Sequence, residues 1–181
     1  MSTVETRIAL PTGIWTADAA HSRVEFAVEY MVGTFRGSFS PFQATLDVDE
    51  TGEAKLSGST WPNAVKVQDE NLEAHLQSPD FFDAERAPEI SFESADITRD
   101  GDILKIVGEL TIKGTAKPVT LAGTISDPIT DPYGQERIGV KLVGEVDRTE
   151  FGLTWNVPLP TGKPALADDV TISAELYLVK G

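Results

Sequence analysis

Apolar residues recur at every second position in several long runs of this chain. In the first run, Val24, Phe26, Val28 and Tyr30 alternate with charged or small residues. Similar runs occupy residues 44–48, 104–112, 138–146 and 170–178. Successive side chains of a β-strand point to opposite faces, so each run predicts a strand with one apolar face and one solvent-exposed face.

Turn-forming residues separate these runs and indicate how the strands connect. Asp, Gly and Pro gather at residues 49–52, 99–102, 113–114 and 127–134. Turns this short join neighbouring antiparallel strands, so we expect an antiparallel sheet. The apolar phase slips by one residue across Ser40-Pro41 and again near Gly58, which predicts a bulge or bend at each place.

One segment has the pattern of a helix rather than a strand. Residues 69–77 begin with Asp69, which can cap a helix N-terminus, and acidic residues follow in the first turn. Leu72 and Leu76 are four positions apart and share one helical face. We therefore expect one short helix.

About eight amphipathic strands must hide their edges, and two all-β architectures do so. A sandwich and a closed up-and-down barrel fit the alternation equally well. Nothing in the sequence divides the chain, so we expect one domain over residues 14–181, preceded by an arm of residues 1–13.

Charge and composition exclude several classes of partner and chemistry. The chain has 15 Lys plus Arg against 29 Asp plus Glu, a net charge of −14 that repels nucleic acids and anionic membranes. It has no cysteine, which excludes disulfides, thiol catalysis and Cys-based zinc sites. No apolar segment has the length of a secretory signal or a membrane span, so we expect a cytoplasmic location without stable membrane insertion.

The sequence has little that could carry out catalysis. His21 and His75 are the only histidines. Asp18, His21 and Ser22 are the residue types of a triad, but neighbouring strand residues point apart, so we expect a hydrogen-bonded turn there. The acids near residues 147–150 and 168–169 lack the spacing of a calcium loop, and no nucleotide-binding loop is present. We expect a non-catalytic binding module with no metal or cofactor.

Two interpretations of the interior remain open at this point. The aromatic residues could fill a solid core, whereas a barrel of about eight strands can also hold one small apolar ligand. Small residues on the apolar faces leave volume and favour a cavity; these are Ala44, Gly108, Gly144 and Ala174.

Seven short segments of the chain form a recognisable pattern when they are taken in order. They are Trp15-x-x-Asp18-x-x-His21-Ser22, Phe35-Arg36-Gly37-Ser38-Phe39, the stretch from His75 to Asp83, Leu110 to Leu121, Asp131 to Arg137, Asp147 to Leu153, and Asp168 to Ile172. Single matches are weak, but their order and spacing together are specific. In these segments the chain resembles the YceI-like family of lipocalin-like polyisoprenoid-binding proteins.

The resemblance implies an eight-stranded antiparallel up-and-down barrel with one helix and a long apolar pore. Its expected ligand is an isoprenoid, such as a quinone-type or polyprenyl lipid, or a similar long-chain lipid. Relatives also suggest a homodimer. This chain departs from the family pattern at Tyr30 and at Leu72-Glu73, where a histidine and an Arg-Asp pair are common.

On this basis we predict which residues hold the lipid. The predicted pore lining is Phe26, Val28, Phe39, Leu46, Phe92, Leu110, Leu142, Ile172 and Leu176. The polar candidates for a head group are Tyr30, His75 and Arg148, with Asp147 as the expected ion-pair partner of Arg148. The alternatives are a filled barrel that acts as a stress-linked interaction or scaffold protein, and an enzyme that uses His75 or Tyr30 as acid or base.

Overall fold

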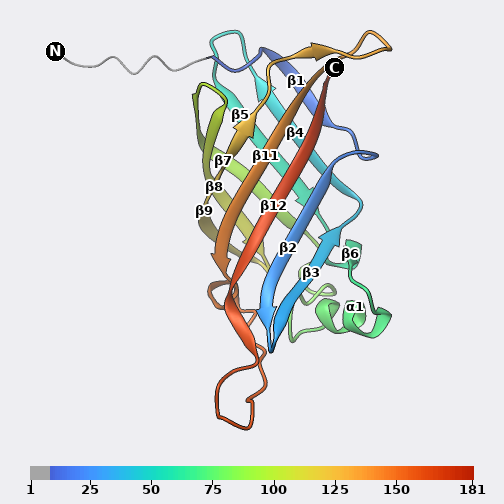
Figure 1. Cartoon of the computed structure of the whole chain (residues 1–181), viewed down its shortest axis with the longest axis vertical. Helices are drawn as coiled ribbons and strands as arrows, with labels where there is room; N and C mark the ends of the chain where they lie inside the picture. The colour runs from blue at the N-terminus through green and yellow to red at the C-terminus, as the bar shows by residue number, and fades with distance from the viewer. Residues whose placement is uncertain (1–8) are drawn as a thin grey trace, which may run out of the picture.

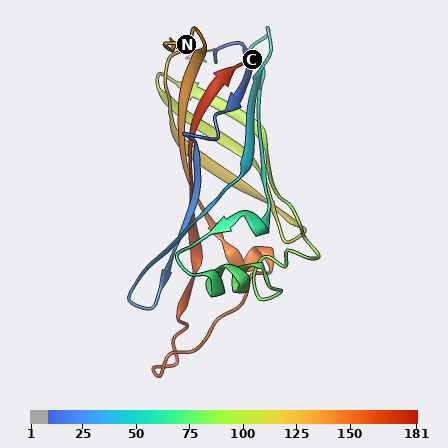
Figure 2. The ribbon, with the colours of Figure 1, turned by 90° about the vertical axis from the view of Figure 1, so that its right-hand side faces the viewer.

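The alternating runs form the strands of a closed β-barrel (Figures 1 and 2). The structure is a computed structural model and describes residues 9–181. Its strands are β1 (Gly13–Ala17), β2 (Arg23–Tyr30), β3 (Gly33–Phe39), β4 (Phe42–Val48), β5 (Ala54–Thr60), β6 (Val65–Lys66), β7 (Ile90–Asp100), β8 (Ile103–Ile112), β9 (Thr115–Ile125), β10 (Ile129–Thr130), β11 (Glu136–Asp147) and β12 (Leu166–Lys180). Its helices are α1 (Glu70–Gln77) and two 3₁₀ turns, η1 (Pro62–Ala64) and η2 (Arg148–Phe151).

Eight long antiparallel strands make up the barrel wall. Strands β1 and β2 together make one wall strand, because both pair with β12. Strands β3 and β4 together make the next wall strand, because β3 pairs with β2 and β4 pairs with β1. From β4 the wall runs through β5, β7, β8, β9 and β11 to β12, and β12 closes the ring against β1 and β2. This order follows the chain, so the up-and-down barrel is confirmed and the sandwich is excluded.

The expected irregularities are found in part. The wall does bend at Ser40-Pro41, where pairing with β2 passes to pairing with β1. A bulge near Gly58 is not found, because β5 keeps a continuous register with β4 there. Shifts in register occur instead in β7 between Ser94 and Asp96 and in β12 between Leu166 and Val170.

One end of the barrel, where β1 begins and β12 ends, is packed solid; we call it the upper end, as Figure 1 is drawn. Trp15 and Leu178 are almost fully buried there, together with Val48, Ile125 and Ile138. The Trp15 indole Nε1 donates to the carbonyl oxygen of Pro11 at 2.9 Å, and Leu10 is buried. The last residues of the predicted arm therefore pack against the barrel, whereas residues 1–8 lie outside the described part of the chain.

Helix α1 and the segment that follows it lie across part of the opposite, lower end (Figure 2). Asp69 caps α1 as predicted, its carboxylate accepting from the backbone N–H groups of Asn71 and Leu72. Phe81 and Phe82 in the segment 78–89 are buried in the core. Within residues 9–181, no helix has the length and apolar character needed to cross a membrane.

Acidic side chains cover the outside of the wall, as the alternation predicts. Five of the examples below lie on a strand between two inward-facing residues, and Asp49 directly follows β4. Six acidic side chains that are exposed in this way are Glu25, Glu29, Asp47, Asp49, Glu109 and Glu175.

Candidate functional site

Two adjacent cavities occupy the interior below the packed upper end. The lower cavity has a volume of about 250 Å³ and the middle cavity one of about 140 Å³. Both are lined mostly by apolar side chains, and they have five wall residues in common: Val24, Thr60, Ile90, Leu110 and Ile172. The interior is therefore a two-part apolar space that ends at the packed core above.

The structure places most of the predicted lining residues around these cavities. Phe26, Val28 and Phe39 line the lower cavity; Phe92, Leu142 and Leu176 line the middle one; Leu110 and Ile172 line both. Leu46 lines neither cavity. Its side chain is 3% exposed and lies in the solid upper core, where β4 pairs with β1 and β5.

Two of the four small residues expected to leave volume do not create the cavity. A methyl group at Gly108 would lie 2.5 Å from Cζ of Phe92, and one at Gly144 would lie 2.6 Å from Cδ2 of Leu121. Neighbouring side chains therefore already fill the space over both glycines. Ala44 and Ala174 do line the middle cavity.

The buried polar groups of the lower cavity are already paired within the protein. Thr60 donates its hydroxyl to the carbonyl oxygen of Pro41 at 2.9 Å. Within the described residues, no buried side-chain nitrogen or oxygen lacks a hydrogen-bond partner. An apolar ligand would therefore leave no polar group unsatisfied when it displaces water.

Arg148 lines the lower cavity, but its guanidinium is held by backbone carbonyl groups. Its Nε donates to Ala167 at 2.8 Å, and one terminal nitrogen donates to Leu153 at 2.6 Å and to Trp155 at 2.9 Å. Burial lowers the pKa of Arg148, and the nearby Asp168 opposes that shift. The side chain thus fastens the loop between η2 and β12 and has few donors left for a ligand.

The expected ion pair between Asp147 and Arg148 is wrong. The carboxylate nearest to Arg148 is that of Asp168, at 3.7 Å. Asp147 instead caps η2, accepting from the Thr149 backbone N–H at 2.9 Å and from its hydroxyl at 2.6 Å. These hydrogen bonds lower the pKa of Asp147.

Tyr30 and His75 lie at the lower end of the cavity and are only partly buried. His75 sits in the last turn of α1, where its Nε2 lies 2.9 Å from a carboxylate oxygen of Asp80. Its ring packs edge-on against Phe81 and Trp155, each with a centroid distance of 5.0 Å. Since Leu72 also lines this cavity and is 44% exposed, the cavity reaches solvent at this end.

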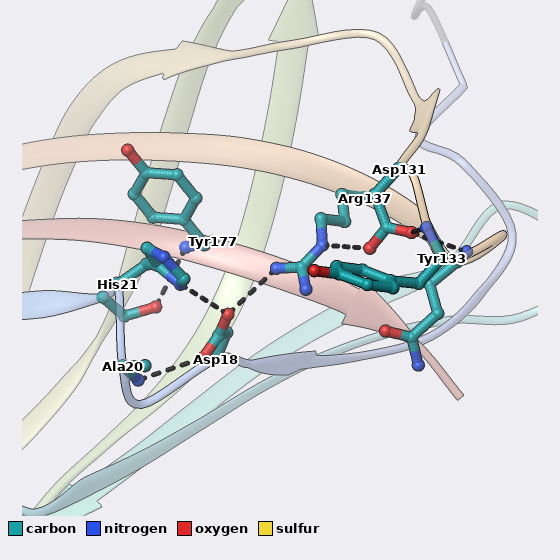
Figure 3. A network of polar contacts seen from close by, with 9 residues as sticks. Asp18, Ala20, His21, Asp131, Tyr133, Arg137 and Tyr177 are labelled. Atoms are coloured by element: carbon teal, nitrogen blue, oxygen red, sulfur yellow. Dashed lines mark hydrogen bonds and ion pairs between the residues drawn. The ribbon is translucent and has the colours of Figure 1, made fainter.

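The segment of Asp18, His21 and Ser22 is a structural joint rather than a catalytic triad, and Figure 3 shows Asp18 and His21 within it. The Asp18 carboxylate lies 2.8 Å from His21 Nδ1 and accepts from Arg137 at 3.0 Å. These contacts lower the pKa of Asp18 to about 2. Ser22 Oγ accepts from the backbone N–H of Tyr177 at 3.0 Å, so the turn is hydrogen-bonded as predicted.

Arg137 extends this network to a second turn. Its Nε donates to Asp131 at 2.7 Å, and Asp131 in turn accepts from the backbone N–H groups of Tyr133 and Gln135. Two of the recognised motifs, Asp18 with His21 and Asp131 with Arg137, therefore meet in one network outside the barrel wall. Across residues 9–181, no three His, Asp or Glu side chains lie close enough together to hold a metal ion.

Comparison with known families shows what kind of barrel this is. The model of the YceI-like domain matches residues 15–178, nearly the whole chain. The chain belongs to the YceI-like family. The resemblance inferred from the seven sequence segments is thereby confirmed.

Relatives support the same assignment. A UPF0312 protein of Staphylococcus aureus (strain N315) is 31% identical over 164 residues, which cover 88% of this chain and 94% of the relative. The crystal structure of BcnA from Burkholderia cenocepacia has a TM-score of 0.73 at 24% identity, over 91% of this chain and 99% of that one. A polyisoprenoid binding domain from Saccharophagus degradans has a TM-score of 0.65 at 10% identity, over 92% of this chain and 98% of that one. Both solved structures share the barrel fold.

Sequence reasoning missed much of the lower wall of this YceI-like cavity. Among the residues it did not assign there, five come from α1, the segment 78–89 and the loop after η2: Leu72, Leu76, Phe81, Phe82 and Trp155. The shared face of Leu72 and Leu76 was visible in the sequence. Its position against the barrel was not, because helical periodicity does not tell where a helix packs.

Proposed function

We propose that this YceI-like barrel is a non-catalytic carrier of a polyisoprenoid, quinone-type or polyprenyl, or of a similar long-chain lipid. The observation that carries the proposal is the apolar interior space of about 250 and 140 Å³, open at the lower end and closed above. Small-molecule sites typically enclose about 300–1,000 Å³ of mostly apolar surface. The chain's cavities together fall in that range.

The chemistry of the walls favours a hydrocarbon over a polar ligand. Apolar surface moved out of water gains roughly 25 cal/mol per Å², and this gain needs no charged partner. Water inside such a space would find few hydrogen-bond partners, because the Thr60 hydroxyl and the Arg148 guanidinium already donate to backbone carbonyl groups. A lipid tail is therefore the better occupant.

The arrangement also suggests how the lipid is oriented. The tail would extend past Leu110 and Ile172, which border both cavities. The head group would stay at the lower end, near the Tyr30 hydroxyl and the His75 ring. The description of the Saccharophagus degradans domain as polyisoprenoid binding supports an isoprenoid tail.

The alternative of a filled barrel finds less support. A filled barrel would pack its aromatic side chains through the middle, as Trp15 and its neighbours do at the upper end. Below that level, Phe26, Phe39 and Phe92 stand around open space instead.

A variant that blocks the space tests the proposal. Leu110→Trp replaces an aliphatic side chain by a bulkier indole ring where the two cavities meet, so lipid that co-purifies with the protein should fall to background. The measurement is organic extraction of purified protein followed by mass spectrometry of the extract, normalised to folded protein.

Val143→Trp is the matched control, because Val143 is 54% exposed on the outer face of β11 and lines neither cavity. It should retain the wild-type amount of lipid. Circular dichroism would establish that both variants are folded. Wild-type lipid content in a folded Leu110→Trp barrel would refute the proposal.

A further inference from the structure

Apolar side chains are exposed around the end at which the cavity opens. Val32 is fully exposed, Met31 is 58% exposed, Leu72 44% and Val157 39%. Met31 and Val32 form the tip of the β2–β3 hairpin, Leu72 lies on α1, and Val157 lies on the loop before β12. All three elements are at the lower end of the barrel (Figures 1 and 2). We call these four residues the apolar rim.

Backbone hydrogen bonds join part of this rim into one unit beside the cavity. The Met31 N–H donates to the carbonyl oxygen of Ala165 at 2.8 Å, and the Ala165 N–H donates to that of Val157 at 2.9 Å. Next to these contacts, Tyr30 pairs with Leu166, and both residues line the lower cavity. The rim is thus continuous with the cavity wall.

The tip of the β2–β3 hairpin has apolar residues at turn positions where other residue types are usually preferred. Met31 and Val32 are the two turn residues between the paired Tyr30 and Gly33, and Met31 has a positive φ of 50°. Such turns favour Gly, Asn or Asp, because a side chain is strained in the left-handed region. Met31 does not recover that cost by packing, since its side chain is 58% exposed, and Val32 beside it is fully exposed. Strain that folding does not explain is a common sign of a functional surface.

We propose that the apolar rim docks on the surface of an electrically neutral lipid bilayer, from which the barrel takes up its lipid and to which it returns it. This inference rests on the proposed function, because a water-insoluble cargo needs a route that avoids water. Shallow insertion of a few apolar side chains gives reversible binding. The net charge of −14 opposes anionic lipid and leaves a zwitterionic surface as the partner.

Exposed apolar residues also occur at the upper end, including Ile129 at 63%. They lie beyond the packed core, where neither cavity reaches. Ile129 is therefore a matched control: it is β-branched, exposed on a short strand and opposite Arg137 in the sheet.

The test is flotation of the full chain with phosphatidylcholine vesicles that contain no other lipid. Val32→Asp should lower the vesicle-bound fraction about tenfold or more, since a factor of ten corresponds to only ~1.4 kcal/mol and a carboxylate in the membrane costs more than that. Aspartate suits a turn, so the variant should fold. Ile129→Asp should bind vesicles like wild type.

Equal vesicle binding by Val32→Asp and wild type would overturn the inference, as would an equal loss in Ile129→Asp. A dimer in sedimentation velocity that Val32→Asp dissociates would also overturn it, because a second copy would then be the partner of the rim. The amount of lipid extracted from the protein tests the proposed function separately. If the barrel contains no lipid but still binds vesicles through Val32, only the carrier function is refuted. If the barrel contains lipid but does not bind vesicles, only the docking is refuted.

Discussion

At the scale of single residues, the hydrogen bonds of Arg148 favour a structural role over the predicted contact with a head group. The side chain does line the lower cavity, as its selection as a polar candidate implied. Its partners, however, are the carbonyl groups of Leu153 and Trp155 in the loop after η2 and of Ala167 at the start of β12. No periodic sequence pattern identifies these carbonyl groups as partners, so the sequence could indicate that Arg148 lies near the cavity but not what it contacts.

Arg148→Met removes these hydrogen bonds while keeping most of the side-chain volume. We expect the free energy of unfolding to fall by about 2–4 kcal/mol, because a buried carbonyl that loses its donor costs about 1–3 kcal/mol. Urea unfolding followed by circular dichroism measures this change. The amount of lipid per folded molecule should stay the same.

Asp168→Asn is the companion variant, and its effect should be below about 1 kcal/mol, because an ion pair with an exposed carboxylate contributes little. A stable Arg148→Met protein that has lost its lipid would instead identify Arg148 as a head-group ligand and contradict the structural role.

At the scale of elements, regular patterns were predictable and irregular segments were not. Asp69 as the cap of α1, the bend at Ser40-Pro41 and the inward faces of the strands all follow from local sequence. The placement of Phe81 and Phe82 does not, because the segment 78–89 has no period and its burial depends on the barrel end it covers. The candidate site was therefore predictable along the strands and not at its lower end.

The structural joint between the β1–β2 turn and β11 should make the free energy of unfolding depend on pH in the acidic range. The pKa of Asp18 is lowered to about 2 from 3.8, so its stabilising effect is complete above about pH 4 and is lost as the pH falls toward 2. Asp18→Asn should lower the free energy of unfolding at pH 7 and flatten its decline between pH 5 and 2. Urea unfolding at a series of pH values measures both effects.

Arg137→Gln tests the same joint from the other side, since Arg137 contacts both Asp18 and Asp131. It should likewise destabilise the protein more at pH 7 than at pH 2. Parallel pH curves for wild type and Asp18→Asn would show that this carboxylate does not stabilise the joint.

At the scale of the whole molecule, an acidic outer surface encloses an apolar interior that is tightly packed at the upper end and contains the two cavities below it. Alternation predicted the two faces, but it is identical in a sandwich and a barrel, and only long-range pairing of β12 with β1, β2 and β11 separates them. The size of the space was also not predictable, because Phe92 and Leu121 fill the room beside Gly108 and Gly144.

Native mass spectrometry of gently purified protein tests the central claim most directly. We expect the intact chain to carry one adduct with the mass of an isoprenoid or other long-chain lipid, released when the protein is unfolded. A spectrum that shows only the mass of the bare chain, before and after incubation with lipid vesicles, would contradict the carrier function.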